Sequence, residues 1–174
     1  MPSVSPEPHP FRFCPVDGTS LEDPDKEGGA RCPSCGRSWY RNSSPVVGCA
    51  IVEDGRVLLT VRGIEPHKGK LDTPGGFLLN GEHPIEGLKR EIREELGIEI
   101  DVSEDDIVVM APHAYAHEED FNLALGFRAR RVSGEVVPAD DVADARWVTP
   151  DEVDDIEFAW EHDRELVRKV LKHG

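Results

Sequence analysis

Three carboxylates lie close together in the stretch "REIREELGI" at residues 90–98. Glu91, Glu94 and Glu95 are spaced i, i+3 and i+4, so a helix would project all three from one face. Like charges at this spacing repel each other by roughly 0.2–0.5 kcal/mol per pair. A hard divalent cation would turn this repulsion into coordination, because Mg²⁺ takes oxygen ligands and keeps several waters for substrate phosphates. The spacing therefore indicates a magnesium site on this helix face.

The surrounding residues extend the pattern into a long signature. Residues 76–98 read "GFLLNGEHPIEGLKREIREELGI" and match G-x5-E-x7-R-E-U-x-E-E-x-G-U at every fixed position, where U is an apolar residue. The residues at the specified positions are Gly76, Glu82, Arg90, Glu91, Ile92, Glu94, Glu95, Gly97 and Ile98. A chance match in a chain of this length has a probability of roughly 10⁻⁷ or below. A solvated acidic helix, the usual meaning of "REIREEL" alone, is therefore disfavoured.

This signature is the Nudix box, and residues 45–172 resemble the Nudix hydrolase family. The resemblance implies a mixed β-sheet between helices, with the box as a loop, a helix and a second loop. It implies that Glu91, Glu94 and Glu95, with the carbonyl of Gly76, bind Mg²⁺ or Mn²⁺. It also implies a pyrophosphatase that hydrolyses a nucleoside diphosphate linked to another moiety.

Two further residues of the signature complete the predicted catalytic set. Arg90 lies on the same helix as the carboxylates and could pair with Glu82, which would hold the preceding loop against the helix. Gly75 and Gly76 carry no side chain, so the backbone could approach the metal closely. We therefore count Glu82 and Arg90 with the three carboxylates as catalytic residues.

The elements that must position these residues are visible in the periodicity. Apolar, β-branched runs predict strands at 46–52, 56–62, 107–111, 121–132 and 145–148. Helical spacing predicts helices at 84–96, which stops at Gly97, and at 158–172, while the Gly- and Pro-rich residues 63–76 read as a long loop. A hairpin before the main helix favours a mixed α/β (α+β) sandwich over a doubly wound parallel sheet.

Composition limits the partners of the chain. The 174 residues include 35 acidic and 20 basic side chains, for a formal charge of −15, which argues against nucleic-acid binding through a broad basic face. We find neither an apolar run long enough for a membrane span nor the hydrophobic region of a secretory signal, so we expect a cytoplasmic protein without membrane contact. Cysteines in that compartment stay reduced.

The N-terminal residues predict a separate metal module. Cys32-Pro-Ser-Cys35 is a metal-binding knuckle, and Cys14-Pro-Val-Asp17 has the same form with Asp17 in place of the second cysteine. We expect a small zinc ribbon at 11–41, after a disordered tail at 1–10 and before a Nudix domain at 42–174. A carboxylate oxygen can ligate Zn²⁺ less tightly than a thiolate. His9 as an alternative ligand and a ribbon that has lost its metal stay open.

The substrate prediction depends on resemblance within the family. Residues 40–77, which lead from the ribbon into the box, are similar to the ribbon-bearing subgroup that cleaves ADP-ribose and FAD. Ribbon-bearing NADH pyrophosphatases are the alternative, but they carry an SQPW-type stretch where residues 110–122 read "MAPHAYAHEEDFN". Other Nudix substrates such as (d)NTPs are a further alternative. We therefore expect ADP-ribose or FAD as the small-molecule nucleotide substrate.

Four residues are candidates for substrate contacts. Arg62 matches the position of a phosphate-binding arginine in many relatives, although a surface charge at a strand end is an equal alternative. Phe77 could line the nucleotide pocket or pack in the core. Glu118 or Glu119 could supply the additional carboxylate that many relatives take from a loop after the box, or belong to a solvated acidic turn. Aromatic side chains at 115, 121, 158 and 160 could stack on a base, but core packing is the commoner use.

Other classes of function compete with hydrolysis. A Nudix sensor that binds a nucleotide without catalysis often lacks catalytic glutamates, whereas this chain keeps all of them. Messenger RNA decapping through a nucleic-acid-binding ribbon is disfavoured by the acidic charge. The sequence leaves the oligomeric state open, including a homodimer formed through the ribbon.

Overall fold

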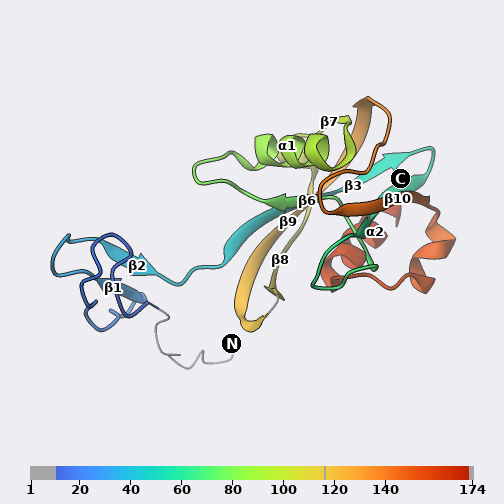
Figure 1. Cartoon of the computed structure of the whole chain (residues 1–174). Coiled ribbons are helices and arrows are strands. Elements are labelled where there is room, and N and C mark those ends of the chain that lie inside the picture. Colours follow the sequence, from blue (N-terminus) through green and yellow to red (C-terminus); the bar gives the residue numbers. More distant parts are fainter. Residues whose placement is uncertain (1–10, 116, 173–174) are drawn as a thin grey trace. The chain divides into compact units, whose positions relative to one another are not determined.

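The structure is a computed structural model that describes residues 11–115 and 117–172 (Figure 1), without the side chains of residues 117–119. The tail predicted at 1–10 and the alternative ligand His9 lie outside the described residues. The chain divides into two compact units, Met1–Asn42 and Ser43–Gly174. Among the described residues, no helix is long and apolar enough to cross a membrane.

The small unit is built on two β-turn knuckles and one hairpin. Strands β1 (Gly29–Arg31) and β2 (Ser38–Tyr40) pair antiparallel. In one knuckle Gly18 donates its N–H to the carbonyl of Cys14 at 2.9 Å, and in the other Gly36 donates to Cys32 at 2.9 Å. Both glycines have positive φ angles, 72° and 76°, that other residues rarely adopt. The two knuckles therefore share one backbone conformation.

The large unit contains one mixed sheet. Its strands are β3 (Ser44–Glu53), β4 (Arg56–Arg62), β5 (Leu71–Asp72), β6 (Gly75–Phe77), β7 (Glu99–Asp101), β8 (Ile107–Tyr115), β9 (His117–Ser133) and β10 (Val142–Val148). The main order is β10-β4-β3-β9-β7, with β5 beside β4, β6 beside β3 and β8 beside β9. Strands β3 and β9 run parallel, and the other pairs are antiparallel. The mixed sheet confirms the predicted fold class.

The two faces of the sheet carry separate cores. On β3, Val47, Cys49 and Ile51 are buried in a cluster with the apolar side of helix α1 (Pro84–Leu96). Ala50 lies in the second cluster with Leu166, Val167 and Val170 of helix α2 (Glu161–Lys172). This alternation follows the two-residue period of a strand. The sheet therefore lies between α1 and α2, as Figure 1 shows.

Helix α1 begins and ends where the sequence predicts. The His83 side chain accepts the N–H of Ile85 at 3.3 Å, and Pro84 occupies the first turn, where its missing N–H costs nothing. Gly97 has φ 67° and donates its N–H to the carbonyl of Arg93 at 3.0 Å, which ends the helix. The helix buries four aliphatic side chains, each worth about 1.5–3 kcal/mol. These are Ile85, Leu88, Ile92 and Leu96.

Two sequence predictions about secondary structure are corrected, and the short strand β7 was missed. The loop predicted at 63–76 contains β5 and the start of β6. These short strands pair with β4 and β3, which satisfy the hydrogen-bonding groups of their backbone. The closing helix begins at Glu161 rather than 158, because residues 157 and 159 bond to the backbone of Leu71 instead. Strand β7 was not predicted, since three residues show too little periodicity.

Candidate active site

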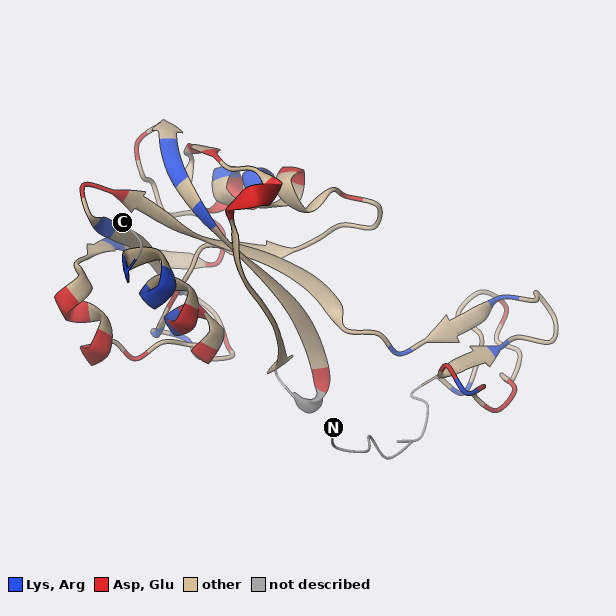
Figure 2. Ribbon diagram, turned by 180° about the vertical axis from the view of Figure 1, so that it is seen from behind, with Lys and Arg blue, Asp and Glu red and all other residues tan. Residues whose placement is uncertain are grey.

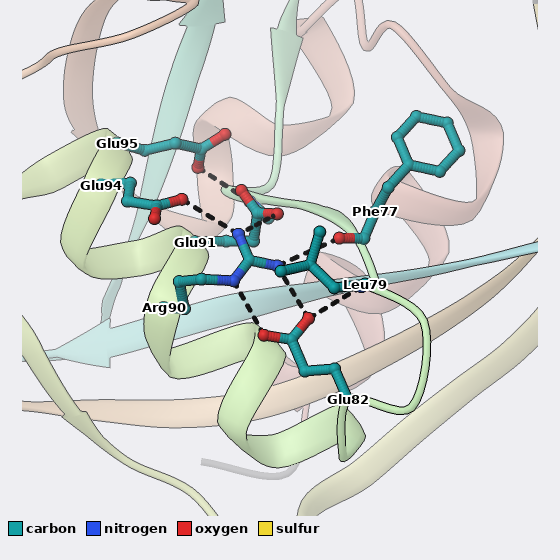
Figure 3. A network of polar contacts seen from close by, with 8 residues as sticks. Phe77, Leu79, Glu82, Arg90, Glu91, Glu94 and Glu95 are labelled. Carbon is teal, nitrogen blue, oxygen red and sulfur yellow. Dashed lines mark hydrogen bonds and ion pairs between the residues drawn. The ribbon is translucent and has the colours of Figure 1, made fainter.

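Arg90 is the centre of a network of carboxylates beside α1 (Figure 3). Its Nε and one terminal nitrogen donate to the two carboxylate oxygens of Glu82, both at 2.8 Å. The other terminal nitrogen donates to Glu91 at 2.8 Å and to Glu94 at 3.0 Å. One guanidinium thus joins three carboxylates of the signature, and the pairing with Glu82 has the predicted form.

Glu82 ties the loop before α1 to the helix. Besides accepting both hydrogen bonds of Arg90, its Oε2 accepts the N–H of Leu79 at 2.9 Å. The hydrogen bonds from Arg90 lower the pKa of Glu82 to about 2, and the bond from Leu79 acts in the same direction. Glu82 therefore stays ionised throughout the neutral range and keeps its hold on the loop.

Glu91 and Glu95 are shielded from solvent, whereas Glu94 is half exposed. Burial raises the pKa of Glu91, against the hydrogen bond from Arg90. Burial also raises the pKa of Glu95 well above its usual range, and the N–H of Gly75, 2.9 Å from Oε2, opposes this. A nearby cation would favour the ionised form of both groups. The environment of these carboxylates therefore fits a bound divalent metal ion.

Two glycines allow β6 to approach the carboxylates. A Cβ atom on Gly76 would lie 2.6 Å from the carboxyl carbon of Glu91 and 2.7 Å from its oxygens. Gly75 has φ 146°, and a Cβ there would collide with the backbone carbonyl of Val47. Only glycine permits these close approaches to Glu91 and to β3, and the predicted approach of this backbone to a metal ion stays a prediction.

A cavity of about 130 Å³ opens next to β6. Phe77, Tyr115 and Trp160 form aromatic parts of its lining, with His113 and Asp163 also facing it. Phe77 is 44% exposed and meets Tyr115 edge-on at 5.6 Å, so the alternative of a core position for Phe77 is wrong. Phe158 is buried in the α2 cluster instead.

Arg62 lines the same cavity but is already paired. It donates to Asp72 at 2.8 Å and to the carbonyl of Pro66 at 2.8 Å, and its guanidinium lies 5.7 Å from the ring centre of Trp160. Asp72 also accepts the hydroxyl of Thr60 at 2.6 Å. Arg62 is therefore not an exposed surface charge, and its contact with phosphate stays a prediction. The two hydrogen bonds use its Nε and one terminal nitrogen, so a contact with phosphate would fall to its other donors.

The remaining substrate candidates stay predictions. Glu118 and Glu119 lie in β9, and their side chains are outside the described part of the chain. Asp72 and Asp163 were missed by the sequence analysis, although both are buried carboxyls on the cavity. A single aspartate forms no motif with the residues next to it in the sequence, so only the distant residues that pack against it in the fold reveal that it lines the cavity.

The small unit gathers the four predicted zinc ligands. One ligand atom from each of Cys14, Asp17, Cys32 and Cys35 lies within 4.8 Å of every other, a group that could hold a metal ion. The sulfur atoms of Cys14 and Cys35 are 3.7 Å apart, and Cys32 Sγ is 3.7 Å from each carboxylate oxygen of Asp17. The N–H of Thr19 lowers the pKa of Asp17 to about 2. Soft sulfur atoms with one ionised carboxylate suit Zn²⁺.

Comparison with known proteins agrees with this geometry. The sequence model of the NUDIX domain matches residues 43–170. The NAD-capped RNA hydrolase NudC of Pseudomonas aeruginosa (strain LESB58) is 35% identical over 141 residues, which are 80% of this chain and 48% of that protein. A MutT-like protein of Streptomyces ambofaciens is 34% identical over 112 residues, 64% of this chain and 67% of that protein. The chain thus spans about half the length of the NudC relatives.

Solved structures share the fold. A Nudix hydrolase from Nitrosomonas europaea superimposes with a TM-score of 0.74 at 24% identity and covers 94% of this chain and 92% of its own. A MutT Nudix hydrolase from Burkholderia pseudomallei gives 0.64 at 27% identity, with 74% and 98% covered. These superpositions define the fold as a mixed α/β sandwich. The chain belongs to the Nudix family of hydrolases.

Proposed function

We propose that the chain is a metal-dependent pyrophosphohydrolase that cleaves a nucleoside diphosphate linked to another moiety. The observation that supports this most is the gathering of Glu91, Glu94 and Glu95 on one face of α1, next to the glycine backbone of β6. Their hard oxygen donors suit Mg²⁺ or Mn²⁺, which Nudix enzymes generally use. A neighbouring cavity with aromatic walls would take the organic part of the substrate.

Each residue of the network has a role in this proposal. Glu91, Glu94, Glu95 and the carbonyl of Gly76 would hold the metal. When bound, the metal supplies charge neutralisation of the diphosphate and an activated water. Arg90 keeps Glu91 and Glu94 in place before the metal binds, and its bidentate pairing with Glu82 holds the loop that carries β6 close to the helix.

Metal removal tests the proposal directly. The purified chain should hydrolyse at least one compound of the panel ADP-ribose, FAD, NADH, diadenosine polyphosphates and (d)NTPs with Mg²⁺ or Mn²⁺. Excess EDTA should abolish the activity, and added metal should restore it. Nucleotide binding without turnover of any compound would instead support the sensor alternative.

The substrate itself has two lines of support. The curated relatives are named for NAD-capped RNA, which favours a nicotinamide dinucleotide. Residues 40–77 are similar to the ADP-ribose and FAD subgroup, which the comparisons do not single out. All of these compounds contain an adenosine diphosphate group, so we propose this group as the recognised part. Ratios of kcat/KM across the panel rank the candidates, because that ratio measures discrimination.

The NudC relatives are named for NAD-capped RNA, so this RNA is included as a test substrate. The prediction of no nucleic-acid partner came from the charge of −15. Figure 2 shows basic segments interspersed with acidic ones along both helices. We propose that free dinucleotides are preferred to capped RNA. A kcat/KM for NAD-capped RNA tenfold above that for NADH would overturn this.

We further propose that residues 11–41 form a zinc ribbon with Cys14, Asp17, Cys32 and Cys35 as ligands, in front of a hydrolase domain at 42–174. The support is that one ligand atom from each of these residues lies within 4.8 Å of every other. The cytoplasmic location and a homodimer stay predictions. Size-exclusion chromatography with light scattering would measure the oligomeric state.

A further inference from the structure

The proposed zinc site of the small unit has an odd number of sulfur ligands, three cysteines and one aspartate. The knuckle Cys14-Pro-Val-Asp17 repeats the form of Cys32-Pro-Ser-Cys35, but a carboxylate stands in place of its second thiol. A thiolate is the better-matched ligand for Zn²⁺, so Asp17 lowers the affinity that four cysteines would give. Zinc binding alone therefore does not explain this carboxylate. Thiol chemistry offers a reason, because three thiols can form only one disulfide among themselves.

The distances within the site fit a tetrahedral zinc ion. With Zn–S bonds of about 2.3 Å, tetrahedral geometry places two sulfur ligands about 3.8 Å apart. The Sγ atoms of Cys14 and Cys35 are 3.7 Å apart, and Cys32 Sγ lies 3.7 Å from both carboxylate oxygens of Asp17. The N–H of Cys35 donates to Cys32 Sγ at 3.4 Å. The residues present therefore suit the ion, and the same geometry brings the sulfur atoms of Cys14 and Cys35 next to each other.

The three thiols differ in their access to solvent. Cys35 is exposed, whereas Cys14 is 2% exposed and Cys32 is 0% exposed. Oxidation of cysteine by peroxides follows thiolate character and exposure, and redox-sensing cysteines often lie next to a second cysteine that reacts with the first oxidation product. Cys14 holds that position beside Cys35, while Cys32 is buried and faces Asp17. The accessible thiol and its neighbour are therefore Cys35 and Cys14.

We propose that Cys35 is a site of oxidation by peroxides, and that its product is a disulfide with Cys14 that releases zinc from the small unit. The Cys35 thiolate attacks one peroxide oxygen, so an S–O bond forms, the O–O bond breaks and the second oxygen leaves as hydroxide. The Cys14 thiolate then attacks the sulfur of Cys35, so the S–S bond forms and the S–O bond breaks with loss of a second hydroxide. Two protons from solvent convert both hydroxides to water. The two sulfur atoms lose two electrons, which hydrogen peroxide gains.

The disulfide removes half of the ligand set. Thiolates bind metal ions, so the site then retains only Cys32 and Asp17, whereas structural zinc sites are almost always four-coordinate. Oxidation stops at this point, because Asp17 carries no sulfur and the buried Cys32 has no further thiol partner in the site. A reductant therefore regenerates the complete set from one disulfide, while four cysteines would allow three pairings. This reversibility agrees with the transient, redox-sensing disulfides found in reducing compartments.

The test begins with the zinc content of the purified whole chain, because the inference rests on the proposed zinc ribbon. A few-fold excess of hydrogen peroxide should then release about one Zn²⁺ per chain to a chromogenic chelator. Of the four cysteines, the two outside the disulfide should still react with an alkylating reagent after denaturation. Peptide mapping should find Cys14 linked to Cys35. A reductant with added zinc should restore the zinc content and all four thiols.

Three variants separate this chemistry from general damage. Cys49→Ala is the control, because Cys49 is buried in the α1 cluster of the large unit, and its zinc release should equal that of the wild type. Asp17→Cys adds a fourth thiol to the site, so a second disulfide can form and oxidation should consume twice as many thiols. In Cys14→Ser the disulfide partner is missing, so dimedone should trap the sulfenic acid of Cys35. If Cys14→Ser holds no zinc, the disulfide map of the wild type decides.

The outcomes distinguish this inference from the proposals on which it rests. A zinc-loaded chain that keeps its zinc in peroxide, or that loses zinc without a disulfide, overturns the inference and leaves the zinc ribbon standing. A disulfide mapped to Cys32 and Cys35, or between two chains, also overturns it. A purified chain without zinc overturns both the ribbon and the inference. Hydrolysis of the nucleotide panel tests the proposed catalysis independently, because its predicted residues lie in the large unit.

Discussion

Arg90 offsets the repulsion between two carboxylates of α1, those of Glu91 and Glu94. Its guanidinium bonds to Glu82, Glu91 and Glu94 at 2.8–3.0 Å, and these bonds raise its own pKa further. The hydrogen bonds are charge-assisted, which makes them stronger than neutral ones. A metal ion would therefore have to share Glu91 and Glu94 with an arginine that already holds them in place.

Glu94 gives the sharpest test of the catalytic assignment. Glu94→Gln keeps the shape of the side chain and removes one negative oxygen ligand. We expect kcat to fall on the order of 10²-fold or more, because a metal contact in the transition state is lost. The fold should survive, since Glu94 is half exposed and its charge repels its neighbours. The measurement is steady-state kinetics with thermal unfolding as the check on folding.

Glu86→Gln is the matched control for Glu94. Glu86 lies in the first turn of the same helix, is largely exposed and pairs with Lys89 at 3.8 Å, and none of the hydrogen bonds of the network described above involves it. Its substitution should leave kcat within about twofold of the wild type. Full activity in folded Glu94→Gln would show that Glu94 is not a ligand of the catalytic metal.

His162 makes stability depend on pH. Burial, and next the neighbouring His113, lower its pKa from an ordinary 6.5 to about 4. The unfolded chain therefore binds more protons than the folded one between these values, so stability is fully present above pH 6.5 and is lost as the pH falls toward 4. The loss from His162 should be on the order of 1–3 kcal/mol in the free energy of unfolding. Urea unfolding at several pH values between 7 and 4 measures it.

Two variants test whether His162 causes this loss of stability. His162→Phe keeps a ring but cannot titrate, so its stability should depend less on pH in this window. His83→Asn is the control, because His83 is exposed and asparagine also caps helices well. An equal pH dependence in His162→Phe and the wild type would assign the effect to other groups, such as His113.

At the scale of the elements, the active site depends on how a loop is clamped to a helix. Arg90 bonds to Glu82 and to the carbonyl of Phe77 at 3.2 Å, so α1 and the segment after β6 are joined by one side chain. Lysine carries one compact ammonium and cannot form the two parallel bonds of arginine. This clamp is therefore specific to the guanidinium.

Arg90→Lys should loosen the loop and reduce activity. The amide of Leu79, which donates to Glu82 at 2.9 Å, should exchange its hydrogen faster, and kcat/KM should fall about tenfold. Arg93→Lys is the control, since Arg93 makes a similar two-bond pair with Glu99 on the exposed side of the same helix. Hydrogen-exchange mass spectrometry and kinetics measure both effects. Unchanged exchange at Leu79 in Arg90→Lys would show that the clamp does not hold the loop.

At the scale of the whole molecule, the chain combines a hydrolase unit with a small unit whose described residues, 11–42, form no large core. The small unit buries Cys14, Ala30 and Cys32 but relies on turns and one short hairpin. Units of this size usually need a metal ion or disulfides for stability, and the described cysteines are all free. The whole chain should therefore carry a structural metal ion in its first unit.

Elemental analysis tests the metal content. The purified chain should contain about one Zn²⁺. Asp17→Cys should hold zinc more tightly against a chelator, because a thiolate is a softer ligand than a carboxylate. Asp25→Cys is a control, since Asp25 lies in the same unit but only caps a turn through Gly29 and Glu27. Absence of zinc together with freely reactive Cys14, Cys32 and Cys35 would show that the ribbon has lost its metal.

The sequence alone determined the features that depend on neighbouring residues. Helix α1 was predicted to the residue, because Pro84, the apolar period and Gly97 act within one segment. The same holds for the carboxylate face and for the Arg90–Glu82 pair, whose residues lie within one loop and one helix. The two knuckles were also visible, since each is a turn of a few residues.

The tertiary structure alone decided the contacts between distant segments. Asp163 meets Thr73 across 90 positions of the chain, because α2 and the segment after β5 pack on the same face of the sheet. For Arg62 the sequence left a phosphate contact and a surface charge as equal alternatives, and its partner Asp72 is set by the pairing of β4 with β5. Such contacts carry no local periodicity and form only when β3 and β9 bring their neighbours together. The carboxylate face of α1 is thus local in origin, whereas the cavity beside β6 is created by folding.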